Sequence, residues 1–169
     1  MRETFRGCTN FNQPVYMPST VTNATSTFLG CTNFNQPINF SRNIDLPYTS
    51  FSSFLSGCTN FNSSINLSAN VTTTYMCNTL RNFNAPVTIE RVYANAFRTF
   101  GDCNKLNSPI TINSAIGSAH FSGMFERCYN FNQPFTVPNN VISVASMFNQ
   151  CSNFNSNISF SETIYDYTN

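Results

Sequence analysis

Cysteine is the residue type in this chain with the widest chemistry, because a thiolate binds metals, forms disulfides and acts as a nucleophile. The chain consists of internal repeats, described below, and six of them carry a cysteine at the same position. The remaining repeat has Leu80 there, which a metal site or a disulfide would not tolerate. Stacked repeats also place Cβ atoms about 4.8 Å apart, wider than a disulfide prefers. We therefore expect a column of reduced, buried thiols. The column comprises Cys8, Cys31, Cys58, Cys103, Cys128 and Cys151.

Asparagine recurs at two further positions of the repeat, two and four residues after the cysteine. Its amide suits either a ligand-binding array or a ladder that satisfies turn backbone groups from one coil to the next. A turn that repeats must repeat its hydrogen bonds, which favours the ladder. The column at four positions comprises Asn12, Asn35, Asn62, Asn84, Asn107, Asn132 and Asn155.

Catalytic chemistry finds no support in the sequence. The single histidine, His120, has no recurring acid or cysteine beside it, and the seven carboxylates recur in no column. Without a Gly-rich phosphate loop or metal-spaced cluster, we predict no catalytic residue, metal or cofactor. Only 9% of the residues are charged and the net charge is +1, so we expect no nucleic-acid binding. The sequence contains no run of about 18 apolar residues, so we expect no membrane span.

An internal repeat positions these columns. The stretch GCTNFNQP at residues 7–14 returns unchanged at 30–37, and in part at 57–61 and 129–134. Alignment on the cysteine position gives about seven repeats with a period near 23 residues, and an insertion around residues 42–48. Apolar residues seven and nine positions after the cysteine, with a polar residue between them, predict one short strand per repeat.

These patterns predict a single solenoid domain over residues 1–169. It is mainly β, with a parallel sheet of short strands over a Phe-rich core. Most repeats carry Val or Ile thirteen positions after the cysteine, Ile44 and Ile164 among them. The segment that follows is compatible with a second strand, a 3₁₀ turn or a single helical turn.

The outward residues of the predicted strands form a polar, nearly uncharged face. In solenoids this face commonly binds ligands, although a plain solvated face is an equal alternative. Amides and hydroxyls suit a glycan or a protein better than a phosphate. The candidate ligand-binding residues are Tyr16, Asn39, Asn66, Thr88, Glu90, Thr111, Asn113, Thr136 and Ser159.

The pattern F-x-G-C-T-N-F, then an I-x-I-type strand, then P-x-x-V and a further Phe, resembles the BspA-type leucine-rich repeats of bacterial and protozoan surface proteins. The N-F-N-Q-P variant with M-F pairs, Met124–Phe125 and Met147–Phe148, is also similar to repeats of mycoplasma and firmicute surface lipoproteins. The chain uses Phe where the family mostly uses Leu. The resemblance implies a right-handed, leucine-rich-repeat-like coil. Such repeats also imply binding, adhesion or recognition without naming a ligand.

Two hypotheses of function follow. The first is a non-enzymatic adhesin-type module at a cell surface, which binds protein or glycan through its sheet face. The alternative is a structural component of a virion, such as a phage tail, fibre or decoration protein. No signal peptide is visible in MRETFRGC, and phage particles assemble inside the cell. Terminal repeats normally carry polar caps, and none is evident here, so we expect self-association or docking through the solenoid ends.

Overall fold

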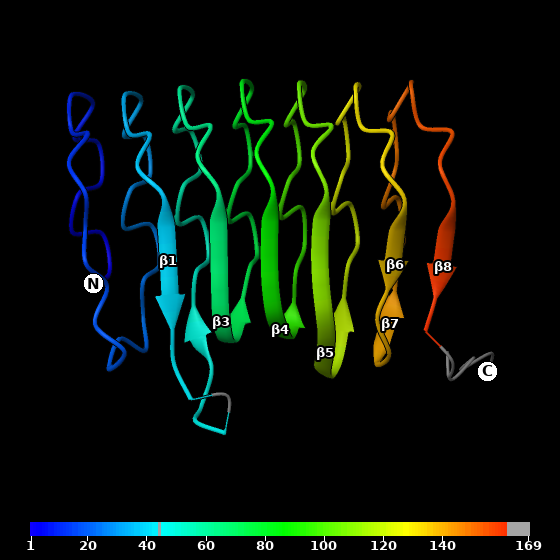
Figure 1. Ribbon diagram of the computed structural model, residues 1–169, viewed down its shortest axis with the longest axis horizontal. Coiled ribbons are helices and arrows are strands. Elements are labelled where there is room, and N and C mark those ends of the chain that lie inside the picture. Colours follow the sequence, from blue (N-terminus) through cyan, green and yellow to red (C-terminus); the bar gives the residue numbers. More distant parts are fainter. Residues whose placement is uncertain (44, 162–169) are drawn as a thin grey trace.

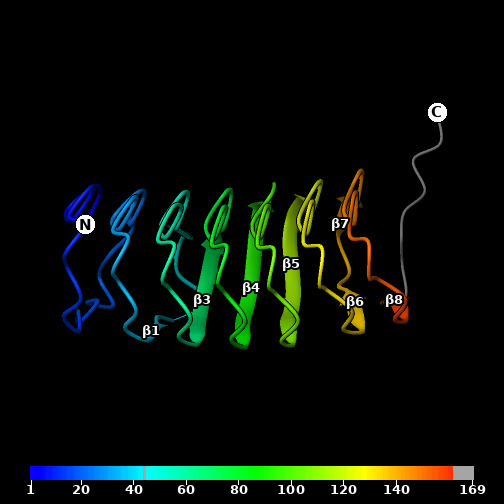
Figure 2. The same cartoon turned by 90° about the horizontal axis from the view of Figure 1, so that it is seen from above.

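The computed structural model describes residues 1–43 and 45–161, which form a parallel β-solenoid (Figure 1). The coils stack in chain order along the long axis, so the first and last described coils lie at opposite ends (Figures 1 and 2). The described residues contain strands and turns but no helix, which confirms the predicted fold class. The strands are β1 (Ile38–Ser41), β2 (Thr49–Ser50), β3 (Ile65–Thr72), β4 (Val87–Asn95), β5 (Ile110–His120), β6 (Phe135–Val137), β7 (Val141–Ser143) and β8 (Ile158–Phe160).

The strands form two parallel sheets. The larger has the order β1-β3-β4-β5-β7, with β2 also paired to β3, and the smaller joins β6 to β8. This pairing defines about five turns, fewer than the about seven repeats expected. The first repeat forms no strand at residues 15–17, where Pro14 and Pro18 flank the segment and offer no N–H to a ladder. The last repeat contributes β8, which pairs only with β6.

Strand register reproduces the aligned repeat positions. Ile38 lies opposite Ile65, Ile65 opposite Val87, and Val87 opposite Ile110. Strands β3, β4 and β5 then continue beyond this region, with register irregularities after Leu67 and after Tyr93. The segment around thirteen positions after the cysteine, for which the sequence allowed a second strand or a turn, is therefore partly strand in these coils. Ile44 and Ile164 lie outside the described residues.

A turn segment closes each coil just before the cysteine position. Within it, the N–H groups five, three and one positions before that point donate to carbonyls of the next coil. Those of Ser26, Phe28 and Gly30, for example, do so over 2.9 Å each. Such groups have no partner inside their own coil, so only a neighbouring coil satisfies them.

The turn also requires a left-handed backbone directly before the cysteine position. The first three repeats place Gly7, Gly30 and Gly57 there, with φ between 73° and 75°. The later repeats keep the conformation, with φ between 59° and 62°, in residues that carry side chains: Thr79, Asp102, Arg127 and Gln150. Non-glycine residues are disfavoured in this region, so stacking on neighbouring coils must hold them in place.

Stacked phenylalanine rings form the core. In one column the ring centroids of Phe34 and Phe61 are 6.0 Å apart, and those of Phe61 and Phe83 are 5.8 Å apart. These three side chains are fully buried. In the same column Phe11, in the first coil, and Phe154, in the last, are only partly buried. Ring burial thus depends on having a coil on both sides.

The described residues of the insertion, 42, 43 and 45–48, lie at the lower end of the second coil in Figure 1. These residues pack back on later coils. The Tyr48 ring stacks on Tyr93 with centroids 4.7 Å apart, and Asn70 donates from Nδ2 to the Leu46 carbonyl over 3.0 Å. The extra residues therefore leave the register of the stack intact.

We predict that Phe83→Ala lowers the free energy of unfolding by about 3–5 kcal/mol, because it leaves a cavity in a fully packed column. Phe11→Ala, a change at the equivalent position of the first coil, is expected to cost clearly less because its ring is partly exposed. Guanidinium unfolding followed by circular dichroism measures both. Equal losses for the two variants would contradict the stacked core.

Candidate functional site

The asparagines four positions after the cysteine form a continuous hydrogen-bonded ladder. Each Oδ1 accepts the backbone N–H of the matching asparagine in the next coil, over 2.7–2.9 Å in all six steps. Asn84, for example, accepts from Asn107 and itself donates to Asn62. This geometry directs the amide oxygens along the stack. They are therefore engaged by the fold and are not offered to a ligand.

A neighbouring column, which sequence reasoning missed, reinforces this ladder. The residue five positions after the cysteine donates its side chain to the asparagine of the previous coil. Ser108 Oγ, for example, reaches the Asn84 carbonyl over 2.6 Å. The signal was present in the sequence, since the column holds only Gln, Ser and one Ala. Its donors are Gln36, Ser63, Ser108, Gln133 and Ser156.

The cysteine thiols form a second ladder in the core. Five thiols donate to a carbonyl of the coil before, as Cys58 does to Phe28 over 2.9 Å and Cys128 to Phe100 over 3.0 Å. The other three are those of Cys31, Cys103 and Cys151. All seven cysteines are free, and Cys77 is buried at a position where most repeats carry Phe. Burial raises the pKa of Cys58 to about 12 and that of Cys151 to about 11.

Cys8 is an exception to the expectation of six buried thiols. Its thiol is exposed, whereas Cys31 and the other cysteines of the column are buried. Cys8 belongs to the first coil, and no described residue packs on the outer side of that coil. The expectation was wrong at this position because each thiol of the column points to the coil before it, as Cys151 does to Phe125, and no described coil precedes Cys8.

The outward strand residues form an exposed row across the larger sheet. Asn39 pairs with Asn66, Asn66 with Thr88, and Thr88 with Thr111, and all four side chains are exposed between buried neighbours. This row is neutral. Next to it, Asn113 donates from Nδ2 to Glu90 Oε2 over 2.8 Å.

The structure does not join all of the candidate ligand-binding residues into one row. Thr136 and Ser159 lie in β6 and β8, where their hydroxyls are 2.8 Å apart, and this smaller sheet is not paired to β5. Tyr16 lies in no strand and is 86% exposed.

A hollow of about 230 Å³ lies at the N-terminal end of the row. It combines polar groups with apolar surface, and the Tyr16 side chain contributes to its wall. Its lining residues are Tyr16, Met17, Ser19, Asn39, Phe40, Ser41, Asn66 and Ser68. Three candidate ligand-binding residues, Tyr16, Asn39 and Asn66, therefore meet at one place.

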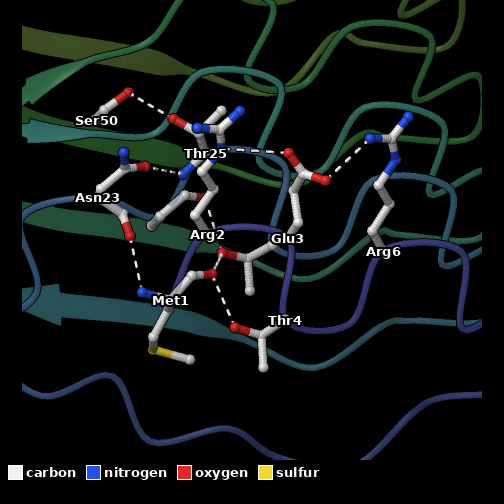
Figure 3. A network of polar contacts seen from close by, with 10 residues as sticks. Met1, Arg2, Glu3, Thr4, Arg6, Asn23, Thr25 and Ser50 are labelled. Atoms are coloured by element: carbon white, nitrogen blue, oxygen red, sulfur yellow. Dashed lines mark hydrogen bonds and ion pairs between the residues drawn. The ribbon is translucent and has the colours of Figure 1, made fainter.

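The ion pairs between described residues lie on the turn edge, although Glu90 and Arg91 lie in β4 of the sheet. Arg98 lies 3.2 Å from both Asp102 and Glu126, and Arg127 lies 3.6 Å from Asp102. A smaller group in the first coil pairs Glu3 with Arg2 and Arg6 (Figure 3), and the hydrogen bond from Arg6 lowers the pKa of Glu3. Sequence reasoning missed both groups because their members recur in no column.

No group of three or more His, Cys, Asp or Glu side chains in residues 1–43 and 45–161 is arranged to hold a metal ion. The same residues include no helix long and apolar enough to cross a membrane. His120 is exposed at the end of β5.

The coil-to-coil ladders and the stacked core define a parallel β-solenoid repeat protein. The protein-family model described as "Mycoplasma protein of unknown function, DUF285" matches the chain twice, over residues 1–90 and 90–161. The chain therefore belongs to this family. The match supports a repeat family related to the resemblance noted above, without singling out BspA-type leucine-rich repeats. No curated protein and no solved structure matched the chain.

We predict that Asn84→Ala lowers the free energy of unfolding by about 1 kcal/mol, because the Asn107 N–H loses its acceptor. Asn155→Ala provides the matched control, since no described residue donates to Asn155 Oδ1. Thermal unfolding in dilute solution compares the two variants. A control variant as destabilised as Asn84→Ala would contradict the structural role of the ladder.

We also predict that one thiol, Cys8, reacts rapidly with a disulfide reagent in the native protein, and that all seven react after unfolding without reductant.

Stability should also depend on pH, because the buried thiols stabilise the fold only in their protonated form. Burial raises the pKa of Cys58, for example, from 9.0 to about 12. This contribution is fully present below pH 9 and is lost as the pH rises towards 12. Unfolding midpoints that stay constant over this interval would contradict it.

Proposed function

We propose that this protein is a non-enzymatic recognition module of the surface-adhesin type, which binds a protein or glycan ligand through the exposed row of its sheet. The observation that carries the proposal is the in-register row Asn39, Asn66, Thr88 and Thr111. It presents amides and hydroxyls at the regular spacing of adjacent strands, about 4.8 Å.

The row is suited to binding because its side chains are already positioned. Its backbone belongs to a parallel sheet over a fully buried core, so few groups need to be ordered when a ligand binds. Each amide both donates and accepts hydrogen bonds, as do the hydroxyls. The exposed Tyr16 ring beside the hollow adds an apolar surface with a polar tip. These groups match a neutral saccharide or a polar protein surface.

The resemblance to BspA-type leucine-rich repeats of surface proteins also supports this proposal, as does the low charge of the sheet face. Under the proposal the protein acts at a cell surface, without a cofactor, a metal or a nucleic-acid partner.

The second candidate is a structural component of a virion that acts through the ends of the solenoid. It is favoured by the apolar side chains of the last coil, since Ile158 and Phe160 are 39% and 48% exposed. Under this alternative the sheet face is a solvated surface, so loss of ligand binding on changes to the row separates the two candidates.

We predict that a glycan array, together with pull-down from host-cell surface extracts, finds a ligand whose binding survives 1 M salt, because the row carries no charge. Asn66→Arg is expected to reduce the affinity at least tenfold. Asn130→Arg is the matched control, because Asn130 is an exposed asparagine of the turn side. Equal effects of the two changes, or a steep salt dependence, would contradict the proposed face.

A further inference from the structure

We propose that the first coil of one copy stacks on the last coil of another, so that the solenoid continues head to tail from one molecule to the next. The partner is a second copy of this chain. The contact uses the two ends of the stack and leaves the exposed row of the sheet free. It is therefore independent of the ligand proposed above.

The last coil presents hydrogen-bond donors of the turn segment. In every earlier coil, the N–H groups five, three and one positions before the cysteine donate to the next coil. In the last coil these groups belong to Ser146, Phe148 and Gln150. No described residue accepts a hydrogen bond from any of the three.

The first coil presents the matching acceptors. In every later coil, the carbonyls six, four and two positions before the cysteine accept those bonds from the coil before. In the first coil they belong to Arg2, Thr4 and Arg6, and no described residue donates to them. A second copy placed at the repeat spacing therefore supplies three acceptors for the three donors.

The other two ladders run in the opposite direction and also continue across this contact. In the first coil, the Asn12 N–H and the exposed Cys8 thiol have no acceptor among the described residues. In the last coil, Asn155 Oδ1 has no donor, and the Phe148 carbonyl lacks the thiol bond that the Phe28 carbonyl receives from Cys58. The register that satisfies the turn segment also brings these groups together.

The apolar side chains at the two ends fit the same arrangement. Ile158 and Phe160 are 39% and 48% exposed, whereas Ile65 and Leu67, at the equivalent positions of an inner coil, are 2% and 0% exposed. A hollow of about 190 Å³ on the last coil is lined by Val144, Ser146, Met147, Phe148, Asn149, Ile158 and Phe160. Partly buried Phe5, Phe11 and Val15 of the first coil provide apolar groups to cover it.

Charge does not oppose the contact. Residues 141–161 include no charged side chain. In the first coil, Glu3 is paired with Arg2 and Arg6 on the turn edge, and the terminal amine of Met1 donates to the Asn23 carbonyl of the second coil (Figure 3). Each of these charged groups is therefore already paired or hydrogen-bonded within its own molecule.

The polarity of the ladders requires two different ends to meet. If two last coils met, turn-segment donors would face donors, and if two first coils met, carbonyls would face carbonyls. Contact between different ends does not close on itself in a straight stack, so it generates an open series of copies. We therefore expect association that grows with protein concentration and has no fixed stoichiometry.

The exposed thiol of Cys8 reports on this contact in the unmodified chain. We expect its rate of alkylation by iodoacetamide to fall at least fivefold between 1 µM and 500 µM protein, because stacking covers it. Sedimentation velocity over the same range should show increasing mass. A constant alkylation rate together with a monomer at 500 µM would overturn the proposal.

Two single substitutions test the direction of the contact. Cys8→Glu blocks the first coil and Phe160→Glu blocks the last, and both residues are exposed. Each variant alone should be monomeric. An equimolar mixture should form dimers and nothing larger, because the unblocked last coil of Cys8→Glu can stack only on the unblocked first coil of Phe160→Glu. Thr88→Glu, on the sheet face, should associate like the unmodified chain.

Circular dichroism establishes that each variant is folded before association is measured. Self-association of either blocked variant at the level of the unmodified chain would overturn the head-to-tail arrangement. A mixture of folded variants that stays monomeric at 500 µM would also overturn it.

Discussion

Each coil of this protein depends on its neighbours to satisfy its backbone hydrogen bonds. The turn segment donates forward to the next coil, and the asparagine and cysteine ladders donate back to the coil before. A single coil cannot satisfy these groups or bury its phenylalanines, so stability arises from interfaces between coils. This explains how a chain with only 9% charged residues remains structured, since Asn, Ser and Thr supply its polarity by bonding the backbone.

Much of the fold was predictable because each repeat position has one physical task. The columns containing Phe83 and Asn84 emerge directly from alignment, and each lies where its chemistry requires. Features that depend on position in the stack were not predictable. Exposure of Cys8 arises from the lack of a described coil before it, and the pairing of Thr136 with Ser159 in a separate sheet depends on how the last coils stack. The left-handed turn was hidden as well, since Thr79 and Asp102 replace glycine there.

The fold separates structural and variable positions. Inward and turn residues repeat closely because each must match the same residue in the next coil. The outward row from Asn39 to Thr111 and the turn edge around Arg98 carry no such requirement, so their residue types differ from coil to coil. A recognition surface on the sheet and a copy-to-copy contact at the ends use different parts of the molecule. Under the two proposals, a head-to-tail series of copies would display one ligand face per copy, in line.

Amide hydrogen exchange on dilute, monomeric protein tests the central claim most directly, because it reports each interface bond separately. The turn-segment N–H groups of Phe28, Cys77 and Phe100 should exchange slowly, and those of Ser146, Phe148 and Gln150 rapidly. The Asn84 N–H should be protected and the Asn12 N–H should not. Equal protection of inner and terminal coils in the monomer would contradict the dependence of each coil on its neighbours.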